Sequence, residues 1–431
     1  MTEGIHCSFC GQAEEDVEAI VSGANVHICD RCIDKAQGAI EQERTFHRKP
    51  DEPSAPVLDW RKTKPQELKA HLDQYVVRQE QAKKALAVAV YNHYKRISAP
   101  ASDEGPELEK SNILLIGPTG TGKTYALRTI AKKLKVPFWI ADATTLTQAG
   151  YVGDDVATIL SGLLQAADYQ VAAAEQGIVY IDEFDKIARK SSSPSNTRDV
   201  AGEGVQQALL KLMEGGIVKV SPKGGRKHPD QKLIAINTAH ILFICGGAFE
   251  GIDKLIARRI QQRPLGFRLA GAGKATMQEA DLLQHISSID LKAYGLIPEL
   301  VGRLPVLTHF TPLQVGTLRE ILVKPRNALL KQYIKLFAME GITLSFTEEA
   351  IDLIAQKAHE LQLGARGLRT ICDRVMSDAM FTLPSEKDIA SYRIDKAYVL
   401  DKLQASAPPT EGARERHRQA QEQAAISPSL G

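Results

Sequence analysis

The sequence predicts an α/β fold in which helices cover both faces of a parallel β-sheet, with a small metal-binding domain before it and a small, mainly α-helical domain after it. Two apolar runs predict the sheet. Residues 112–116 read Asn-Ile-Leu-Leu-Ile before a glycine-rich loop, and residues 177–181 read Gly-Ile-Val-Tyr-Ile before two acids. Such runs are typical of strands buried on both faces. Four cysteines in two close pairs near the N-terminus predict the metal-binding domain.

The composition is typical of a soluble globular protein with several domains. The chain has 431 residues, 43% of them hydrophobic and 25% charged, and this length suggests about two to four domains. A net charge of +2 gives no general argument for a nucleic-acid or membrane partner. No apolar run reaches the roughly 18–20 residues that span a bilayer, and the N-terminus lacks a secretory signal. We therefore expect a cytoplasmic protein.

The glycine-rich loop after the first strand fits the phosphate-binding pattern G-x-x-x-x-G-K-[ST]. Its glycines let successive N–H groups converge on a polyphosphate. Lys123 would contact the β- and γ-phosphates, and Thr124 would bind Mg²⁺. A chance glycine- and threonine-rich loop is a poor alternative, because the pattern stands between a predicted strand and a predicted helix. The loop, which indicates ATP or GTP, consists of Gly117, Pro118, Thr119, Gly120, Thr121, Gly122, Lys123 and Thr124.

Two acids follow the second apolar run in the arrangement of a Walker B motif. Parallel strands end at the same edge of a sheet, so Asp182 and Glu183 should lie beside the phosphate loop. We expect Asp182 to hold Mg²⁺ and Glu183 to orient and activate the attacking water. The second acid favours hydrolysis over a simple nucleotide-dependent switch.

The four N-terminal cysteines form two C-x₂-C pairs separated by eighteen residues, at Cys7, Cys10, Cys29 and Cys32. This spacing lets two knuckles close one tetrahedral Zn²⁺ site. With four thiolates the site looks closed and therefore structural. Two disulfides or a redox pair are the alternatives, and the absence of a leader sequence favours zinc.

The remaining pattern divides the chain. We expect a zinc-binding domain of treble-clef type at residues 1–48, a polar linker at 49–64, a large ATPase domain at 65–312, a small domain at 313–403 and a disordered tail at 404–431. Further strands are predicted at residues 137–140 and 241–245, with helices at 81–92 and 125–134. Cys245 and Cys372 lie in apolar surroundings and are expected to be inert core thiols.

Taken together, these motifs closely resemble the ClpX family, the zinc-bearing AAA+ unfoldase subunits of the Clp protease. The resemblance covers residues 7–403, apart from the linker. Besides the cysteines and the Walker motifs, it depends on six short stretches at residues 141–147, 150–153, 198–200, 226–228, 295–299 and 364–369. It implies an AAA+ fold, the cofactors ATP, Mg²⁺ and Zn²⁺, and a homohexameric ring.

The resemblance implies that three loops face the channel of this ring. Tyr151 and Val152 match the loop whose aromatic residue grips an extended polypeptide. A second channel loop corresponds to Arg198, Asp199 and Val200. A basic entrance loop corresponds to Arg226, Lys227 and His228. Without the family, the stretches around Tyr151 and Arg226 would be read as surface turns.

Two arginines acquire roles from the same resemblance. Arg303 matches an arginine finger that reaches the γ-phosphate of the neighbouring subunit, and Arg366 matches a second sensor of nucleotide. A finger in trans can raise the rate by roughly 10³–10⁵, so hydrolysis would require assembly. Val76 and Val77 match the region near the adenine base, and Tyr125, next to the phosphate loop, joins the candidate nucleotide-binding residues.

The sequence departs from the family pattern at two places. Leu265, Gly266 and Phe267 occupy the position of the Ile-Gly-Phe loop that docks on a ClpP-type peptidase, and the insert around them differs from the usual family sequence. Leucine keeps the volume and apolar character of isoleucine, so we expect docking to survive. Arg78 stands where the family typically has glycine, and it could change the affinity for nucleotide.

These observations favour an ATP-driven protein unfoldase that threads its substrates through a pore and delivers them to a ClpP-type peptidase. We expect the zinc domain to recruit substrates and adaptors. A remodeller that acts without a peptidase is one alternative. A nucleic-acid motor is another, but the balanced charge and the 6% aromatic content argue against it. No convincing proteolytic triad or dyad is present, so the chain itself is not expected to cleave peptides.

Overall fold

The computed structural model describes residues 5–24, 26–37, 63–98, 108–147, 154–189, 202–221, 233–261, 282–386 and 389–404. Within them the central element is a five-stranded parallel sheet with strand order β11-β3-β10-β7-β4. The strands are β3 (Ile113–Ile116), β4 (Phe138–Asp142), β7 (Ile178–Asp182), β10 (Leu242–Gly247) and β11 (Val306–His309). Because all five run the same way, their carboxyl ends meet at one edge of the sheet.

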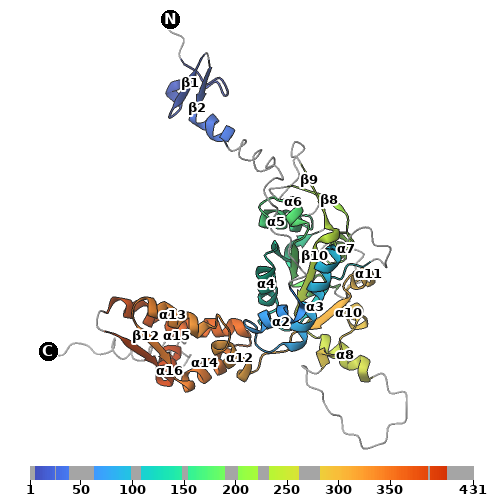
Figure 1. Cartoon of the computed structure of the whole chain (residues 1–431), viewed down its shortest axis with the longest axis vertical. Helices are drawn as coiled ribbons and strands as arrows, with labels where there is room; N and C mark the ends of the chain where they lie inside the picture. The colour runs from blue at the N-terminus through green and yellow to red at the C-terminus, as the bar shows by residue number, and fades with distance from the viewer. Residues whose placement is uncertain are drawn as a thin grey trace, which may run out of the picture.

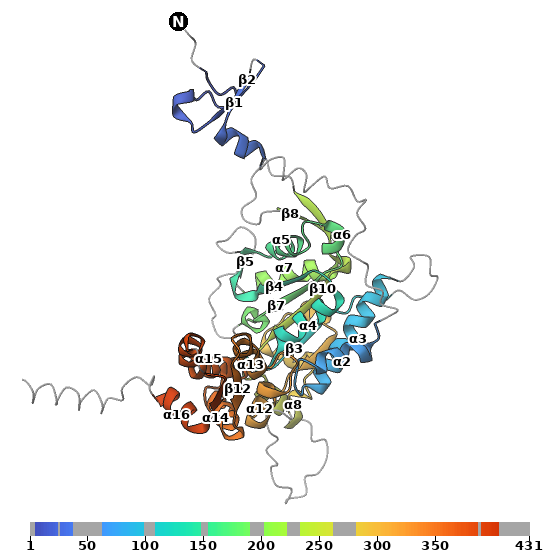
Figure 2. The same cartoon turned by 60° about the vertical axis from the view of Figure 1, so that its left-hand side comes forward.

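Alternate residues of these strands supply two separate hydrophobic cores. In β3, Ile113 and Leu115 pack on one face, whereas Leu114 and Ile116 pack on the other. The first face is covered by α2 (Pro65–Asp73), α3 (Glu80–Ile97) and α4 (Lys123–Leu134) (Figure 2). The second is covered by α5 (Thr158–Ala166), α7 (Glu203–Glu214), α8 (Ile252–Gln261), α10 (Ser288–Tyr294) and α11 (Pro298–Gly302).

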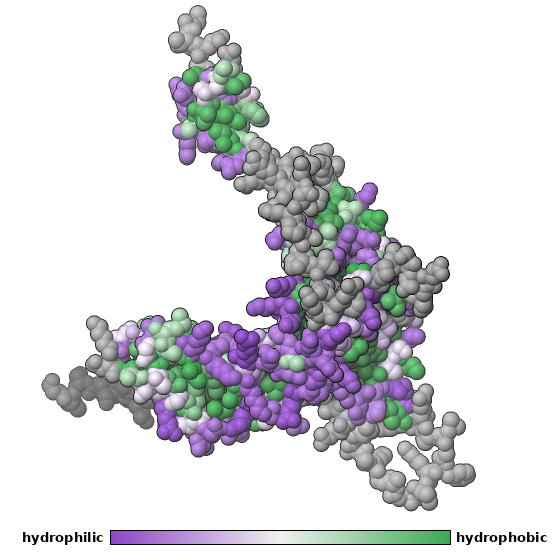
Figure 3. Space-filling model, in the orientation of Figure 1, coloured by the Kyte–Doolittle hydropathy of each residue, from purple (hydrophilic) through white to green (hydrophobic). Residues whose placement is uncertain are grey.

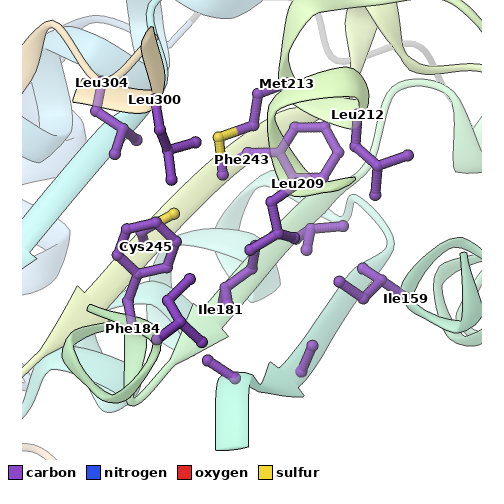
Figure 4. Close-up of a cluster of buried hydrophobic side chains, with 14 of the residues drawn as sticks. Ile159, Ile181, Phe184, Leu209, Leu212, Met213, Phe243, Cys245, Leu300 and Leu304 are labelled. Carbon is purple, nitrogen blue, oxygen red and sulfur yellow. The ribbon is translucent and has the colours of Figure 1, made fainter. Parts of the chain in front are cut away.

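Figure 4 shows the core of the second face, where Ile181, Phe243 and Cys245 of the sheet gather with Leu209 of α7 and Leu300 of α11. All five side chains are fully buried. A strand with both faces covered needs apolar residues at every position, and this explains the unbroken apolar runs of the sequence. We call the part from α2 to β11 the sheet domain.

The sheet domain also contains several smaller elements. They are α6 (Val171–Ala174), the short parallel pair β5 (Leu146–Thr147) and β6 (Asp154–Asp155), and the antiparallel pair β8 (Ile217–Val220) and β9 (Ile234–Asn237). A 3₁₀ turn, η4 (Thr238–His240), leads from β9 into β10.

A second body, the helical domain, follows β11 and has its own core (Figure 1). Its elements are α12 (Val315–Val323), α13 (Leu329–Met339), β12 (Thr343–Phe346), α14 (Glu348–Glu360), α15 (Ala365–Thr382), β13 (Ser391–Ile394) and α16 (Lys396–Gln404). The strands β12 and β13 pair in parallel, although 44 residues lie between them. The chain begins α14 with a cap in which the Thr347 hydroxyl accepts a hydrogen bond from the Ala350 N–H.

The N-terminal module is small. The strands β1 (Ile20–Gly23) and β2 (Val26–Cys29) form an antiparallel hairpin, and residues 30–37 are helical. Its buried residues are Cys7, Cys29 and Cys32, against which Val17, Ile20 and Ile28 pack. Together, the three parts confirm the predicted α/β architecture with its N-terminal and C-terminal additions. Among the described residues, no helix is long and apolar enough to cross a membrane.

Candidate functional site

The loop between β3 and α4 forms a backbone nest at the carboxyl edge of the sheet. Gly120 and Gly122 have φ values of 76° and 101°, and α4 begins directly afterwards at Lys123. Left-handed glycines before a helix turn successive N–H groups towards one point, which suits a phosphate group. The Thr121 hydroxyl donates to the Pro118 carbonyl at 2.8 Å, and the Gly117 N–H donates to the Gly247 carbonyl of β10 at 3.2 Å.

Lys123 lies inside this loop and is only 8% exposed. Its ammonium donates to the carbonyl of Gly117 and to that of Pro118, the latter at 3.0 Å. Burial lowers the pKa of Lys123 to about 8, although the nearby Asp182 and Asp185 act to raise it. Within the described part of the chain, the hydrogen-bond partners of Lys123 are carbonyl groups, which compensate a buried cation poorly. A polyphosphate would supply further negative charge beside it.

Asp182, the last residue of β7, is held beside the loop from two sides. Its Oδ2 accepts from the Thr124 hydroxyl at 3.1 Å, and its Oδ1 accepts from the Tyr180 hydroxyl at 2.9 Å. A carboxylate next to a hydroxyl is the donor set that Mg²⁺ uses in phosphate-loop proteins. Glu183 follows with φ 53°, and its N–H donates to Asp182 Oδ1 at 3.0 Å. Within the described residues no hydrogen bond engages the exposed Glu183 carboxylate.

These groups line a cavity of about 480 Å³ that both domains enclose. The sheet domain provides the phosphate loop, the end of β7, and Gly247, Ala248 and Glu250. The helical domain provides part of α12, the connection to α13 and the start of α15. The lining includes Tyr75, Thr119, Gly120, Thr121, Gly122, Lys123, Thr124, Tyr125, Asp182, Glu183, Asp185, Asn327, Arg366 and Arg369. Arg366 is close enough to lower the pKa of Lys123 further.

The two domains meet most closely at Gly120 and Gly364. The Ala365 N–H donates to the Gly120 carbonyl at 2.9 Å. A Cβ on Gly120 would lie 2.2 Å from the Leu363 carbonyl oxygen, and one on Gly364 would lie 2.8 Å from the Gly120 carbonyl oxygen. Only glycine permits this backbone-to-backbone contact, which places the N-terminus of α15 and Arg366 over the phosphate loop.

Five residues predicted for the nucleotide site do not line the cavity. Gly117 and Pro118 begin the phosphate loop, where their carbonyls accept hydrogen bonds from Lys123. Val76 is buried in the core under α2, Val77 is half-buried, and neither lines the cavity; their neighbour Tyr75 does. Arg303 lies at the end of α11, where it is 53% exposed and 3.4 Å from Glu214. Within one chain it therefore does not face the nucleotide pocket.

The four N-terminal cysteines form one cluster, with all four Sγ atoms within 4.8 Å of one another. Cys10 Sγ and Cys29 Sγ are 3.7 Å apart. Two sulfurs that bind one tetrahedral Zn²⁺ at about 2.3 Å are separated by about 3.8 Å, so the residues present fit the ion. The Cys29 N–H donates to Cys7 Sγ at 3.3 Å, an interaction that stabilises a thiolate ligand.

The cysteine pKa values show why this cluster needs a cation. Burial raises the pKa of Cys29, and it raises that of Cys32 to about 12. Burial acts in the same direction on Cys7, but hydrogen bonds from the N–H groups of Cys10, Cys29 and Phe9 outweigh it and lower that pKa to about 6. Four neighbouring thiols cannot all ionise by themselves, whereas a dication compensates four thiolates.

Several predicted residues lie outside the described part of the chain. They are the channel-loop candidates Tyr151, Val152, Arg198, Asp199, Val200, Arg226, Lys227 and His228, and the docking candidates Leu265, Gly266 and Phe267.

Three family models match this chain, in the order of its structural parts. A ClpX C4-type zinc finger matches residues 5–42, an AAA domain of the Cdc48 subfamily matches residues 108–307, and the C-terminal D2-small domain of ClpB protein matches residues 313–397.

Curated relatives match nearly the whole length. A protein of Porphyromonas gingivalis named ATP-dependent Clp protease ATP-binding subunit ClpX is 53% identical over 400 residues, or 91% of this chain and 95% of the relative. The protein of the same name from Bacteroides fragilis is 53% identical over 398 residues, or 92% of this chain and 95% of the relative. The chain belongs to the ClpX family. The protein of the same name from Bacteroides thetaiotaomicron is 52% identical over 399 residues, with 92% and 95% coverage.

Family membership and geometry together identify the cofactors. The cysteine cluster within the ClpX zinc finger binds Zn²⁺. The AAA domain, with its phosphate loop and Walker B acids in one cavity, makes the chain an ATPase that uses Mg²⁺. Nothing in the matched families indicates a peptidase.

The structure also reveals pocket residues that the sequence did not suggest. Tyr75, Asp185, Asn327 and Arg369 line the cavity, and the Tyr125 hydroxyl donates to Asn327 Oδ1 at 2.8 Å. Tyr75 is adjacent to the predicted Val76, so a wider window around that motif would have included it. Asn327 lies 202 residues from its partner, and no local pattern could have paired the two.

Proposed function

We propose that this ClpX-family ATPase is a protein unfoldase that threads tagged or unstructured polypeptides through the pore of a homohexamer and delivers them to a ClpP-type peptidase. The observation that carries the proposal is the nucleotide cavity between two domains of one chain. When an ATPase pocket is enclosed by two domains, a change of nucleotide can change their relative orientation. Such a motion is the output that a mechanical enzyme needs.

Within this proposal, the phosphate loop, the Walker B acids and Arg366 have separate tasks. The phosphate-loop N–H groups and Lys123 would bind the polyphosphate, and Thr124 and Asp182 would hold Mg²⁺, which would supply positive charge beside the phosphates. Glu183 orients the attacking water and accepts its proton. Arg366 lines the cavity from the start of α15 and would contact the nucleotide from the helical domain.

Arg303 would complete the site of a neighbouring subunit. It is half exposed at the end of α11, outside the pocket of its own chain, and its one ion pair among the described residues is the 3.4 Å contact with Glu214. An exposed arginine of this kind is available to a second copy. A ring of identical chains would place one such arginine at every site.

The proposal assigns the remaining predicted residues to contacts with proteins. The loops with Tyr151, Arg198 and Arg226 would face the substrate in the pore. The loop with Leu265 and Phe267 would dock on the peptidase. These loops would extend from a large ATPase domain at residues 65–312, to which a small domain at 313–403 is attached.

The zinc-binding module, residues 1–48 in this proposal, would recruit adaptors or substrates. It exposes apolar side chains that its small core does not need, with Phe9 76%, Val21 58% and Val26 57% exposed. Hydrophobic residues gather on the module in Figure 3. Exposed apolar patches of this kind are typical of protein-binding surfaces. A reducing cytoplasm would keep its four thiols available for zinc.

An unfolding assay tests the proposal. The full chain is mixed with ATP and a stable fluorescent protein that carries an unstructured tag, with and without a ClpP-type peptidase. We expect ATP-dependent loss of fluorescence in both cases and peptide fragments only with the peptidase. Loss of fluorescence without fragments would favour a remodeller that acts alone. Unchanged fluorescence, together with ATP turnover stimulated by single-stranded DNA, would favour a nucleic-acid motor.

A further inference from the structure

An ion pair outside the nucleotide pocket connects the two domains. Arg78 Nη2 lies 2.6 Å from Glu320 Oε1, and Arg78 Nε donates to Glu320 Oε2 at 3.3 Å. The contact is bidentate and joins residues that are 242 positions apart. Arg78 precedes α3 of the sheet domain, whereas Glu320 lies on α12 of the helical domain (Figure 1).

Each partner stands close to a residue that lines the pocket. Tyr75 lines the cavity three positions before Arg78, and Ile321 lines it directly after Glu320. Segment 74–79 is thus one lip of the pocket, and segment 320–329 is the other. The Arg326 N–H donates to the Gln74 carbonyl at 2.8 Å, so the lips also touch through their backbones.

The backbone of the first lip is specialised for this position. Arg78 and Gln79 are consecutive left-handed residues, with φ values of 57° and 59°, a conformation that side-chain-bearing residues rarely adopt. Gln79 is buried and makes three hydrogen bonds with Thr311. Its Nε2 donates to the Thr311 carbonyl at 2.9 Å, and its Oε1 accepts from the Thr311 N–H at 2.8 Å and from the Thr311 hydroxyl at 3.2 Å. Thr311 lies between β11 and α12, where the chain passes from one domain to the other.

Arg78 and Gln79 therefore contact different parts of the chain. Gln79 makes a buried contact with the connection between the domains, and Arg78 makes an exposed contact with α12 of the helical domain. Arg78 is 65% exposed, so the ion pair can break and form at little cost, whereas the buried amide contacts stay in place.

We infer that the Arg78–Glu320 ion pair is a latch that sets how tightly the two lips of the nucleotide pocket close, which makes Arg78 and Glu320 positioning residues for nucleotide binding. Closure brings Ile321 and Tyr75 together around the bound nucleotide. Breaking the pair lowers the fraction of molecules in the closed arrangement, and apparent affinity falls in proportion to that fraction.

Charge reversal tests the latch in the full-length protein. Arg78→Glu and Glu320→Arg should each raise the Kd for a fluorescent ADP analogue about fivefold and speed its dissociation, because like charges then face each other across the lips. The double variant Arg78→Glu/Glu320→Arg should recover most of the affinity lost in the single variants, because opposite charges meet again across the lips. Recovery should fall short of the parent, because Lys324, which lies 3.4 Å from Glu320 in the parent, then faces a like charge on α12. About 1 M salt should shrink these differences by screening the exposed pair.

Arg319→Gln is the matched control. Arg319 also lies on α12, but it pairs with Glu348 and with Asp352 inside the helical domain. Its loss should leave the Kd unchanged. Equal effects of Arg319→Gln and the reversals, or failure of the double variant to recover although its thermal midpoint matches the parent, would overturn the latch. Nucleotide binding is measured apart from unfolding, so a negative unfolding assay would leave this result intact.

Discussion

Asp182 and Glu183 are adjacent acids whose surroundings differ. Asp182 receives hydrogen bonds from the hydroxyls of Thr124 and Tyr180 and from the Glu183 N–H, so its position is fixed before a metal ion arrives. Glu183 adopts a left-handed backbone that turns it out of the strand direction, into the cavity. One acid is therefore suited to hold a cation, and the other is free to act on water.

Glu183→Gln should separate binding from hydrolysis. Glutamine keeps the shape of the side chain but cannot accept a proton, so kcat should fall by about 10²–10⁴ while the Kd for ATP stays within a few-fold of the parent. Steady-state turnover and equilibrium binding of a fluorescent ATP analogue measure the two quantities. Asp182→Asn is the contrasting variant and should raise the Mg²⁺ concentration required for activity. Near-normal turnover of Glu183→Gln would remove Glu183 from the water-activating role.

His93 gives the sheet domain a predicted sensitivity to acid. It is 2% exposed, and its Nε2 lies 3.0 Å from the His240 carbonyl oxygen. Burial lowers the pKa of His93 to about 3, with Arg96 and Lys110 adding in the same direction. As pH falls below about 6.5, His93 becomes protonated in the unfolded chain but stays neutral in the folded chain. The contribution of His93 to the free energy of unfolding is therefore fully present above pH 6.5 and is lost progressively as the pH falls towards 3.

Urea unfolding at pH 7, 6 and 5 measures this loss, which can reach about 1.4 kcal/mol per pH unit for one group. The variant His93→Gln should flatten the dependence, because glutamine does not titrate. The exposed His359 provides the control, and His359→Gln should keep the parent slope. An unchanged slope in His93→Gln would show that other groups cause the acid sensitivity.

At the level of elements, the sequence predicts which segments are buried strands better than it predicts which distant segments pair with one another. The strands β3, β7 and β10 are recognisable because burial on both faces demands unbroken apolar runs. By contrast, β11 carries polar Thr308 and His309 and has no such signature; only its parallel pairing with β3 makes it a strand. Distant pairings, such as Arg78 with Glu320 or Tyr125 with Asn327, arise from the meeting of two domains and leave no local pattern.

The start of α15 should be sensitive to a single methyl group. Gly364 has φ 57°, and a Cβ there would lie 2.8 Å from the Gly120 carbonyl oxygen, so Gly364→Ala should push α15 and Arg366 away from the phosphate loop. We expect the Kd for nucleotide to rise about tenfold or more, with the thermal midpoint of the sheet domain little changed. Gly341→Ala is the control, because Gly341 has φ 77° but no atom near its Cβ position. Equal effects of the two variants would assign the loss to backbone strain rather than to the domain contact.

At the scale of the whole molecule, the nucleotide site is complete in one respect and incomplete in another. A single chain brings the phosphate loop, the Walker B acids and Arg366 into one cavity, but it leaves Arg303 outside, beside Glu214. If Arg303 acts on a neighbour, the functional unit is the boundary between two chains. Two inactive variants with different defects should then recover ATP turnover when they are mixed in one ring.

Mixing Glu183→Gln with Arg303→Ala tests this dependence. Each variant alone should turn over ATP very slowly, the first for lack of a base and the second for lack of the finger. In a 1:1 mixed ring, a subunit with intact Glu183 sometimes has a neighbour with intact Arg303, and independent sites should give roughly a quarter of parental turnover. The recovered fraction is measured as steady-state ATP turnover after the subunits have exchanged between rings. If Arg303 acted within its own chain, every site in the mixture would keep one defect, and the mixture would stay as inactive as its components.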